Sequence, residues 1–386
     1  MLLTNIHQFR VRELLCYTCV MKKELLSEKC SEYLDEVMNL NDLPGLAVGV
    51  SFGSAEFIGV RGYRDFEKRD PLSEDTIFHC ASVSKLFTSS AIMRLVEAGA
   101  LNLNDRLCDV LPDLRIRDER AGDIRLIDML THTSGLGDVD DYRWYDFETD
   151  DDSLRRYVYE SDEVINRPML WNPGEGRFRY SNIAYEILGQ IVSEYSDRMP
   201  DAKSRLSFED FIARYLLEPA GMRSSTMKTF ERTGAPDFRN NAHMALPHEK
   251  KPDRSIGPVE FYPYTRQHAP SSTLTSNVSD LLRWGRANMN AETRRTAWSE
   301  YATVPNNGEK MGIGWFMREQ TAFAANERPQ VYRLCGHEGT DDGFRASFWI
   351  CPELEIVTVV LSNLSGAPVK KINKKLFDTV TRTCAL

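Results

Sequence analysis

The amino-acid sequence predicts an α+β fold, with an antiparallel sheet of about six strands, terminal helices on the sheet, and a mostly helical lobe beside it. Two observations lead to this prediction. Short apolar segments with strand character gather near both ends of the chain, whereas the middle has helical periodicity and irregular loops. Six short strands need a common sheet, and the middle offers them no other partners. The two groups of strands are therefore expected to pair.

The predicted strands form an N-terminal pair and a C-terminal group. A Gly-Ser turn separates the pair, 46–52 and 57–62, which is a hairpin signal. The last two members of the C-terminal group are joined by a tight turn over 352–354. The four members of that group are 312–318, 330–336, 344–351 and 355–361.

Helical periodicity marks the rest of the chain. Segments 22–40 and 369–380 are predicted to cover one face of the sheet. We expect residues 1–21 to be an N-terminal extension and 22–386 one domain, with an α/β lobe (22–80 and 305–386) and a helical lobe (81–304). In the helical lobe, helices are predicted at 82–95, 127–136, 183–195, 208–217, 278–287 and 291–301, with an irregular excursion over 229–268.

Composition limits the partners and the compartment. The 386 residues carry a formal net charge of -9 without a basic stripe, so no nucleic-acid partner is expected. No run of eighteen apolar residues occurs and the N-terminus lacks a signal-peptide core, which predicts a cytoplasmic protein with no membrane partner. The eight cysteines are scattered, as is typical of reduced thiols, and the lone Cys16-x-x-Cys19 and dispersed histidines predict no metal or cofactor.

Ser82 and Lys85 stand three positions apart at the predicted start of an apolar helix. This spacing brings the amine beside the hydroxyl on one face of the first turn. A serine hydroxyl becomes a good nucleophile when a base lies within hydrogen-bond reach, and an unpaired N–H at a helix start can receive a developing oxyanion. A second Ser-x-x-Lys, at 225–228, follows a helix-stop signature and unpatterned sequence, and we interpret it as a chance copy.

Tyr180-Ser181-Asn182 is the only Tyr-x-Asn of the chain and lies at a predicted loop-to-helix junction. A phenol beside an ammonium is stabilised as phenolate, so Tyr180 near Lys85 could take and return the serine proton. Asn182 could hold Lys85 and a substrate carbonyl. The alternative is structural: Asn182 as a helix N-cap and Tyr180 as a packed aromatic.

His337-Glu338-Gly339 is the only His-x-Gly, at the end of a predicted strand. A glycine on an edge strand lets a substrate backbone lie close, and His337 could donate to a substrate carboxylate or carbonyl, or relay a proton. The alternative is that His337 is an ordinary surface residue.

Residues 137–152 are strongly acidic with interleaved aromatics. One interpretation is a solvated loop anchored by its aromatic side chains. The other is a lid whose carboxylates favour a cationic substrate group.

In this chain order, Ser82-x-x-Lys85, Tyr180-x-Asn182 and His337-x-Gly339 resemble the serine β-lactamase and penicillin-binding protein superfamily. Residues 130–136, 173–174, 312–315, 343–344 and 352–353 are also similar to its class C branch, so the resemblance covers about 22–386. It implies the β-lactamase/transpeptidase-like fold.

The resemblance also implies roles for the motif residues. Ser82 is the nucleophile, Lys85 its activating partner, Tyr180 the general base and acid, and Asn182 a substrate contact. His337, Gly339 and Thr340 line the substrate strand, and the N–H groups of Ser82 and Thr340 form the oxyanion hole.

The implied reaction is acyl transfer from a small ester, an amide, a D-amino-acid-containing peptide or a β-lactam through a covalent acyl-enzyme. A non-catalytic penicillin- or peptide-binding relative and an acyltransferase remain open as alternatives. His337 departs from the lysine of class C β-lactamases, since His-x-Gly is typical of related esterases, D-amino-acid peptidases and amidases. Glu338 should disfavour anionic substrates unless it points to the other face of the strand.

Overall fold

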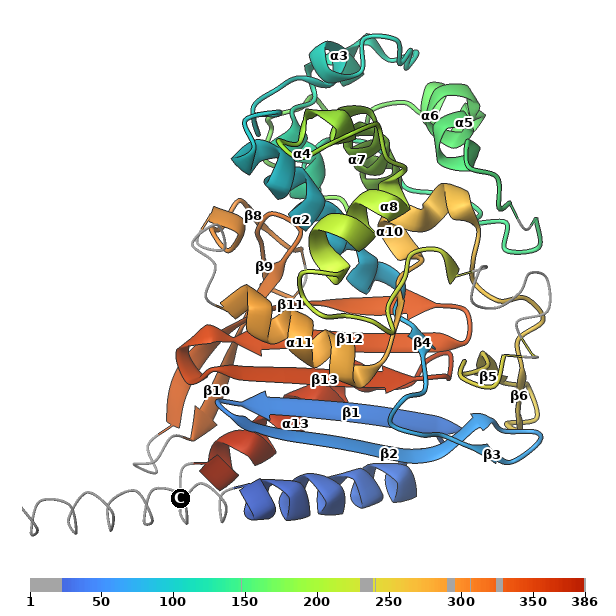
Figure 1. Ribbon diagram of the computed structural model, residues 1–386, viewed down its shortest axis with the longest axis vertical. Coiled ribbons are helices and arrows are strands. Elements are labelled where there is room, and N and C mark those ends of the chain that lie inside the picture. Colours follow the sequence, from blue (N-terminus) through green and yellow to red (C-terminus); the bar gives the residue numbers. More distant parts are fainter. Residues whose placement is uncertain are drawn as a thin grey trace, which may run out of the picture.

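The structure is a computed structural model that describes residues 23–146, 148–229, 239, 241–289, 296–305, 307–323 and 329–384. The predicted N-terminal extension and the Cys16-x-x-Cys19 pair lie outside these residues. Within them, nine strands form one antiparallel sheet, in the order β3-β2-β1-β13-β12-β11-β10-β9-β8 (Figure 1). Strands from the two ends of the chain are therefore neighbours, as the sequence predicts, because β1 pairs with β13.

All six predicted strands are present, and three two-residue strands extend the sheet at its edges. Gly314 adopts a φ of +78°, so 312–315 form a turn and the following strand begins later than predicted. The strand predicted over 330–336 continues to Asp341. The nine strands are β1 (Gly45–Phe52), β2 (Ala55–Asp65), β3 (Asp70–Pro71), β8 (Ala302–Thr303), β9 (Lys310–Met311), β10 (Phe316–Phe323), β11 (Pro329–Asp341), β12 (Phe344–Cys351) and β13 (Ile356–Ser362).

The two faces of the sheet bury different helices. Along β1, Leu46, Val48 and Val50 point to the face covered by the helix over 23–40 and by α13 (Val369–Cys384), as the period-two alternation of a strand requires. On the other face, α11 (Val278–Met289) packs so closely on β13 that a Cβ on Gly285 would lie 2.5 Å from Val357. In Figure 1, most of the helical part of the chain lies above β11.

One helix of the helical part is clearly shorter than predicted. His132 adopts a φ of +56°, beyond the end of α4, so the helix predicted over 127–136 ends early. The helices are α2 (Ser84–Glu97), α3 (Leu107–Val110), α4 (Leu126–Leu130), α5 (Ser153–Glu160), α6 (Asp162–Ile165), α7 (Asn182–Tyr195), α8 (Phe208–Ile212) with a π-helical continuation (Ala213–Leu217), α10 (Ala269–Ser272), and the 3₁₀ turns η1 (Ala81–Val83), η2 (Glu119–Asp123), η3 (Ser196–Arg198), η6 (Arg266–His268) and η7 (Pro352–Leu354).

Two predictions for the middle of the chain need correction. The helix predicted over 291–301 falls partly on residues outside the described ones; residues 296–297 are helical, and a turn at 298–299 ends the helix earlier than predicted. The region 229–268 contains a small hairpin of β5 (His248–Lys250) and β6 (Ile256–Pro258). A second small pair joins β4 (Phe78–His79) to β7 (Thr275–Ser276) just before Ser82.

Among the described residues, none of the helices combines the length and apolar character that crossing a bilayer requires.

Candidate active site

Ser82 lies in the 3₁₀ turn η1, which leads directly into α2. In Figure 1, α2 runs from the sheet into the helical part of the chain. The sequence predicts this helix start. Lys85 follows one turn later and is fully buried, and its Nζ donates to Ser82 Oγ at 3.0 Å. The residue before the serine, Ala81, adopts a φ of +47°, which is uncommon for a residue with a Cβ. The hydroxyl and the amine therefore meet as predicted.

The Lys85 ammonium has an acceptor for each of its three protons. Besides Ser82 Oγ, Nζ donates to Asn182 Oδ1 at 2.5 Å and to the Ser271 carbonyl at 2.8 Å. Burial lowers the pKa of Lys85 to about 8, although the nearby carboxylates of Glu186 and Asp138 act in the opposite direction. A sizeable neutral fraction of this amine is therefore present close to neutral pH.

Tyr180 lies against the same amine. Lys85 Nζ is 4.9 Å from the centre of its ring, and the ring stacks on His132 at 4.3 Å between centroids. Burial raises the pKa of Tyr180 well above its usual value, and a hydrogen bond with Ser82 opposes this only in part. Burial therefore opposes formation of a Tyr180 phenolate, because lost hydration of the anion outweighs the hydrogen bond with Ser82.

Asn182 connects Lys85 to the loop that precedes α5. Its Nδ2 and its backbone N–H both donate to Asp138 Oδ1 at 2.8 Å. The N-cap of α7 is Ser181, whose hydroxyl accepts from the Ala184 N–H, so the alternative that Asn182 caps this helix is wrong. Asn182 instead fixes the amine through its Oδ1.

His337 lies within β11 and faces Tyr180 and Phe316, with ring centroids at 6.2 and 4.9 Å. Its Nδ1–H donates to the Glu338 carbonyl at 2.5 Å, which leaves Nε2 with the lone pair. Burial lowers the pKa of His337 to about 3, and Lys85 adds to this effect. His337 is buried rather than a surface residue, and its neutral ring offers an acceptor in place of the donor that the sequence suggested.

Gly339 and Thr340 belong to a part of β11 that extends past β10. The pairing of β10 with β11 runs from Phe323 with Pro329 to Phe316 with Gly336, so among the described strands 337–341 pair only with β12. A Cβ on Gly339 would lie 2.3 Å from the Cys80 carbonyl. The glycine thus lets β11 approach the turn that carries Ser82.

Glu338 points to the opposite face of β11 from His337, as strand alternation permits. The indole N–H of Trp349 donates to its Oε1 at 2.8 Å, and Arg318 lies 3.6 Å from the same oxygen. Burial raises the pKa of Glu338. The carboxylate is thus held by two partners rather than presented to Ser82.

A cavity of about 510 Å³ opens at Ser82. Lys85 and Gly339 lie behind its wall, whereas most predicted site residues line it directly. The sequence-based prediction missed Tyr142, Phe316 and Asp341 as lining residues, although Asp341 shares strand parity with His337. The cavity is lined by Ser82, Asp138, Tyr142, Phe178, Tyr180, Asn182, Val304, Asn307, Glu309, Phe316, His337, Glu338, Thr340, Asp341 and Trp349.

The acidic loop over 137–152 contributes Asp138 and Tyr142 to this cavity. Several of its other carboxylates form ion pairs with arginines of neighbouring elements. Glu148 and Asp150 each lie 3.0 Å from Arg156, and Asp151 pairs with Arg266. These pairs fasten the loop to α5 and η6.

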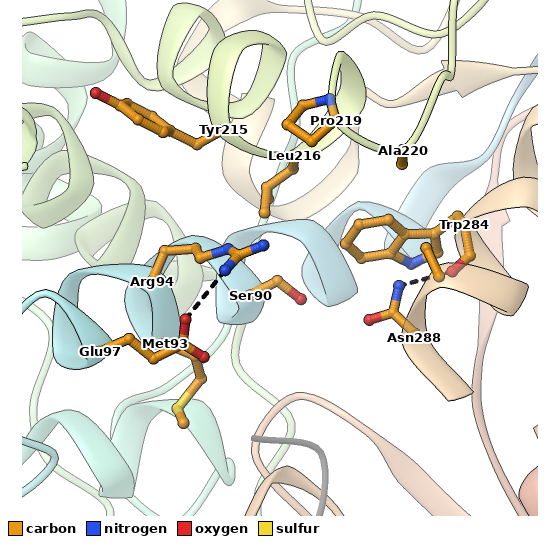
Figure 2. Close-up of a pocket in the computed structure, with 11 residues that line it drawn as sticks. Ser90, Met93, Arg94, Glu97, Tyr215, Leu216, Pro219, Ala220, Trp284 and Asn288 are labelled. Atoms are coloured by element: carbon orange, nitrogen blue, oxygen red, sulfur yellow. Dashed lines mark hydrogen bonds and ion pairs between the residues drawn. The ribbon is translucent and has the colours of Figure 1, made fainter. Parts of the chain in front are cut away.

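A smaller cavity, of about 140 Å³, lies between α2, the π-helical segment and α11 (Figure 2). Ser90, Arg94, Leu216 and Asn288 are among its lining residues, and it shares none with the cavity at Ser82. No grouping of three or more His, Cys, Asp or Glu side chains suited to a metal occurs in the described part of the chain.

An antiparallel sheet flanked by helices, with a serine at the start of a helix hydrogen-bonded to a buried lysine, is the arrangement of the β-lactamase/transpeptidase-like fold. The sequence model of the Beta-lactamase family matches residues 31–380. The chain belongs to this family.

Curated relatives are similar at low identity. Protein flp of Staphylococcus aureus (strain MW2) is 25% identical over 356 residues, which is 88% of this chain and 65% of the relative. Penicillin-binding protein 4* of Bacillus subtilis (strain 168) is 26% identical over 295 residues, 73% of this chain and 60% of the relative. The chain thus spans less than two thirds of either relative.

Solved structures share the fold. The D-amino acid amidase of Ochrobactrum anthropi SV3, solved with L-phenylalanine amide, aligns with a TM-score of 0.72 and 18% identity over 93% of this chain and 98% of that one. The class C β-lactamase of Rhodobacter sphaeroides gives 0.68 and 21%, over 92% and 99%. The octameric penicillin-binding protein homologue of Pyrococcus abyssi gives 0.71 and 23%, over 91% and 76%.

Proposed function

We propose that this chain is a hydrolase that cleaves a small ester, amide or D-amino-acid-containing peptide through a covalent acyl-enzyme on Ser82. The observation that carries the proposal is the buried Lys85 Nζ, 3.0 Å from Ser82 Oγ and with a pKa lowered to about 8. An amine that is partly neutral near pH 8 can take a proton from the hydroxyl it contacts. A surface lysine, with its ordinary pKa, would remain protonated.

The first half of the reaction is attack on the substrate carbonyl. Ser82 Oγ bonds to the carbonyl carbon while Lys85 accepts the hydroxyl proton, and the carbonyl oxygen becomes an oxyanion. The backbone N–H groups of Ser82 and Thr340 are the proposed donors to that oxyanion. The tetrahedral species then expels the alcohol or amine and leaves an acyl group on Ser82.

Tyr180 is the proposed acid for the leaving group. Its raised pKa keeps it a neutral phenol, and its hydrogen bond with Ser82 holds it beside the tetrahedral carbon, so it can protonate the alcohol or amine as the bond from that carbon breaks. The proton held by Lys85 restores the phenol. Water then attacks the acyl group, with Lys85 or Tyr180 taking its proton, and Ser82 is released.

Residues 337–341 of β11 have β12 as their only partner among the described strands, and this free side supports binding of a short extended substrate. An edge without a strand partner can hydrogen-bond to a peptide-like backbone. The fold shared with an amidase and with β-lactamases is consistent with either an amide or a strained lactam as substrate. Because the neutral His337 offers an acceptor, we favour esters and amides over β-lactams, which carry a carboxylate.

The test is covalent labelling followed by turnover. A fluorophosphonate should modify Ser82, identified by peptide mass spectrometry, and the Ser82→Ala variant should take no label. Ser225→Ala, the matched control from the second Ser-x-x-Lys, should label as the unchanged chain does. Modification of Ser225, or no modification by any acylating probe, contradicts the proposal.

Turnover separates the alternatives. Steady release of nitrophenol from a short-chain nitrophenyl ester supports a hydrolase. A stoichiometric burst without turnover indicates the non-catalytic binding relative. Transfer of the acyl group to an added amine, in preference to water, indicates an acyltransferase.

A further inference from the structure

The charged groups that line the cavity at Ser82 are carboxylates. Among the described residues that line it, four are Asp or Glu and none is Lys or Arg. Two of the four have cationic partners behind the wall, since Glu309 pairs with Lys370 at 2.6 Å and Glu338 lies 3.6 Å from Arg318. Asp138 and Asp341 form no ion pair with an arginine or lysine among the described residues, although Lys85 acts on both electrostatically and Arg345 acts on Asp341.

In each of these two aspartates, one carboxylate oxygen accepts hydrogen bonds from neighbouring residues of the protein. Asp138 Oδ1 accepts the two Asn182 N–H bonds and one from the Val139 N–H at 2.9 Å. Asp341 Oδ2 accepts from His79 at 2.7 Å and from Ser272. The other oxygen of each carboxylate has no hydrogen bond to a described residue, which leaves it available to a group in the cavity.

Tyr142 lies close to both aspartates. Asp341 and Asp138 each act on its hydroxyl electrostatically, and its ring also lines the cavity. The ring is held in place by stacking on Trp144, at 4.7 Å between centroids. An aromatic ring next to two carboxylates is a favourable environment for a cation, because the ring face and the carboxylates both carry negative potential.

An independent observation comes from the other wall. His337 is 2% exposed and lines the cavity, and its Nε2 has no hydrogen-bond partner among the described residues. Because Nδ1–H is committed to the Glu338 carbonyl, Nε2 can only accept. A buried acceptor without a partner costs free energy unless a ligand donates to it.

We infer that the cavity takes acyl donors that carry an ammonium group next to the reacting carbonyl, and excludes those that carry a carboxylate. The ammonium binds between Asp138, Asp341 and the Tyr142 ring, and a further N–H of the substrate donates to His337 Nε2. The inference rests on the proposed function, since it names the substrates of the same acyl transfer.

The experiment compares three substrates that differ in one group. D-Alanine p-nitroanilide carries an ammonium, its N-acetyl derivative is neutral, and its N-succinyl derivative carries a carboxylate. The L-enantiomers are measured in parallel so that handedness does not obscure the effect of charge. We expect kcat/KM for the ammonium form to exceed that for the neutral form by at least ~10-fold, as a hydrogen-bonded charge provides, with the carboxylate form slowest.

Asp341→Asn tests the site directly, with Asp342→Asn as a control that removes the same charge from the next residue, which does not line the cavity. Asp138 is not used because it also holds Asn182. Asp341→Asn should lower the ammonium-to-neutral ratio of kcat/KM about tenfold, the scale of one charged hydrogen bond, and Asp342→Asn should leave it unchanged.

Equal kcat/KM for the three substrates in the unchanged protein overturns the inference, and so does an equal effect of the two variants. If Asp341→Asn does not fold, the unchanged protein still provides a test, because the three substrates differ in charge at one position. A carboxylate form that is hydrolysed as fast as the ammonium form contradicts the inference. Labelling of Ser82 by a fluorophosphonate together with equal rates on all three substrates would retain the proposed function and remove only this inference.

Discussion

The chain contains two Ser-x-x-Lys segments, and their surroundings differ completely. In the first, the side chains of Ser82 and Lys85 meet at 3.0 Å in the wall of a cavity. In the second, Ser225 bonds to Asp280 at 2.9 Å while Lys228 turns away to pair with Asp210 at 2.7 Å. The same four-residue pattern therefore yields a coupled pair in one place and two separate structural contacts in the other.

The difference lies in local backbone and in burial. The first segment enters a helix directly, so a separation of three residues brings its side chains together. The second is extended at Thr226, which pairs with Thr275 and sends neighbouring side chains apart. Burial then lowers the pKa of Lys85, whereas Lys228 is partly exposed beside a carboxylate.

The largest expected difference is between the two serines. Ser82→Ala should reduce kcat on a nitrophenyl ester by at least ~10⁴-fold, because loss of a nucleophile removes the covalent route. Ser225→Ala should keep kcat within about twofold and cost ~1 kcal/mol of unfolding free energy through its lost hydrogen bonds. Steady-state kinetics and urea unfolding measure both, and a comparable loss of kcat in the two variants would contradict the comparison.

The two lysines should differ in activity and in pH dependence. With Lys85 as the base, kcat/KM should rise with pH and level off above the pKa of about 8. Lys85→Met should lower kcat by ~10²–10⁴-fold and abolish that rise. Lys228→Met, the control, should change neither and should lose less than ~1 kcal/mol of stability. A pH profile that Lys85→Met leaves unchanged would assign the base elsewhere.

Lys85 also links stability to pH. Its pKa falls from 10.5 in the unfolded chain to about 8 in the folded one, so between these values the unfolded state holds a proton that the folded state has lost. The unfolding free energy relative to Lys85→Met should therefore rise with pH from about 8 to 10.5, by ~3 kcal/mol in total. Urea titrations across this range test the slope, and a flat difference would mean that the amine is hydrated.

Alanine substitutions of a glycine near each Ser-x-x-Lys segment should differ less in their effects on stability and kcat. Gly339→Ala forces a Cβ to within 2.3 Å of the Cys80 carbonyl and should cost ~1–3 kcal/mol, with lower kcat because the turn at Ser82 must shift. Gly221→Ala meets nothing closer than 3.9 Å but keeps a φ of +70°, so it should cost ~1 kcal/mol without an effect on kcat. Equal kcat values in the two variants would show that the position of β11 does not affect the reaction at Ser82.

The smallest effect is expected from the acidic loop. Glu148→Gln with Asp150→Asn removes ion pairs to Arg156 that are exposed to solvent, which should cost less than ~1 kcal/mol and leave kcat/KM for cationic and neutral substrates equally unchanged. A selective loss on cationic substrates would show that these carboxylates act on the substrate, as a lid would require.

Much of the fold was predictable from local patterns. Alternating or continuous apolar runs marked all six principal strands, and chain-end pairing followed because the middle lacks strand partners. The predicted boundaries were less accurate near residues in the left-handed region. His132 lies just beyond a helix that ends earlier than its apolar spacing predicts, and Gly314 precedes a strand that begins later than predicted. Edge strands of two residues carry no pattern of their own.

The residues of the site could be predicted from their motifs, but their pKa values and protonation states could not. Spacing put Ser82 beside Lys85, and chain order suggested Tyr180 and His337, yet the pKa of each group depends on burial by distant segments. The tautomer of His337 depends on a hydrogen bond to the next residue's carbonyl, which no sequence pattern marks.

The left-handed backbone at Ala81 has a consequence for how this protein could be stabilised. An L-residue at this φ is higher in energy than glycine by ~1 kcal/mol, so Ala81→Gly would relieve conformational tension next to the nucleophile. The same change would make the η1 turn, which positions Ser82, more flexible. A substitution that raises the stability of the fold at this position would therefore position the Ser82 hydroxyl less well for catalysis.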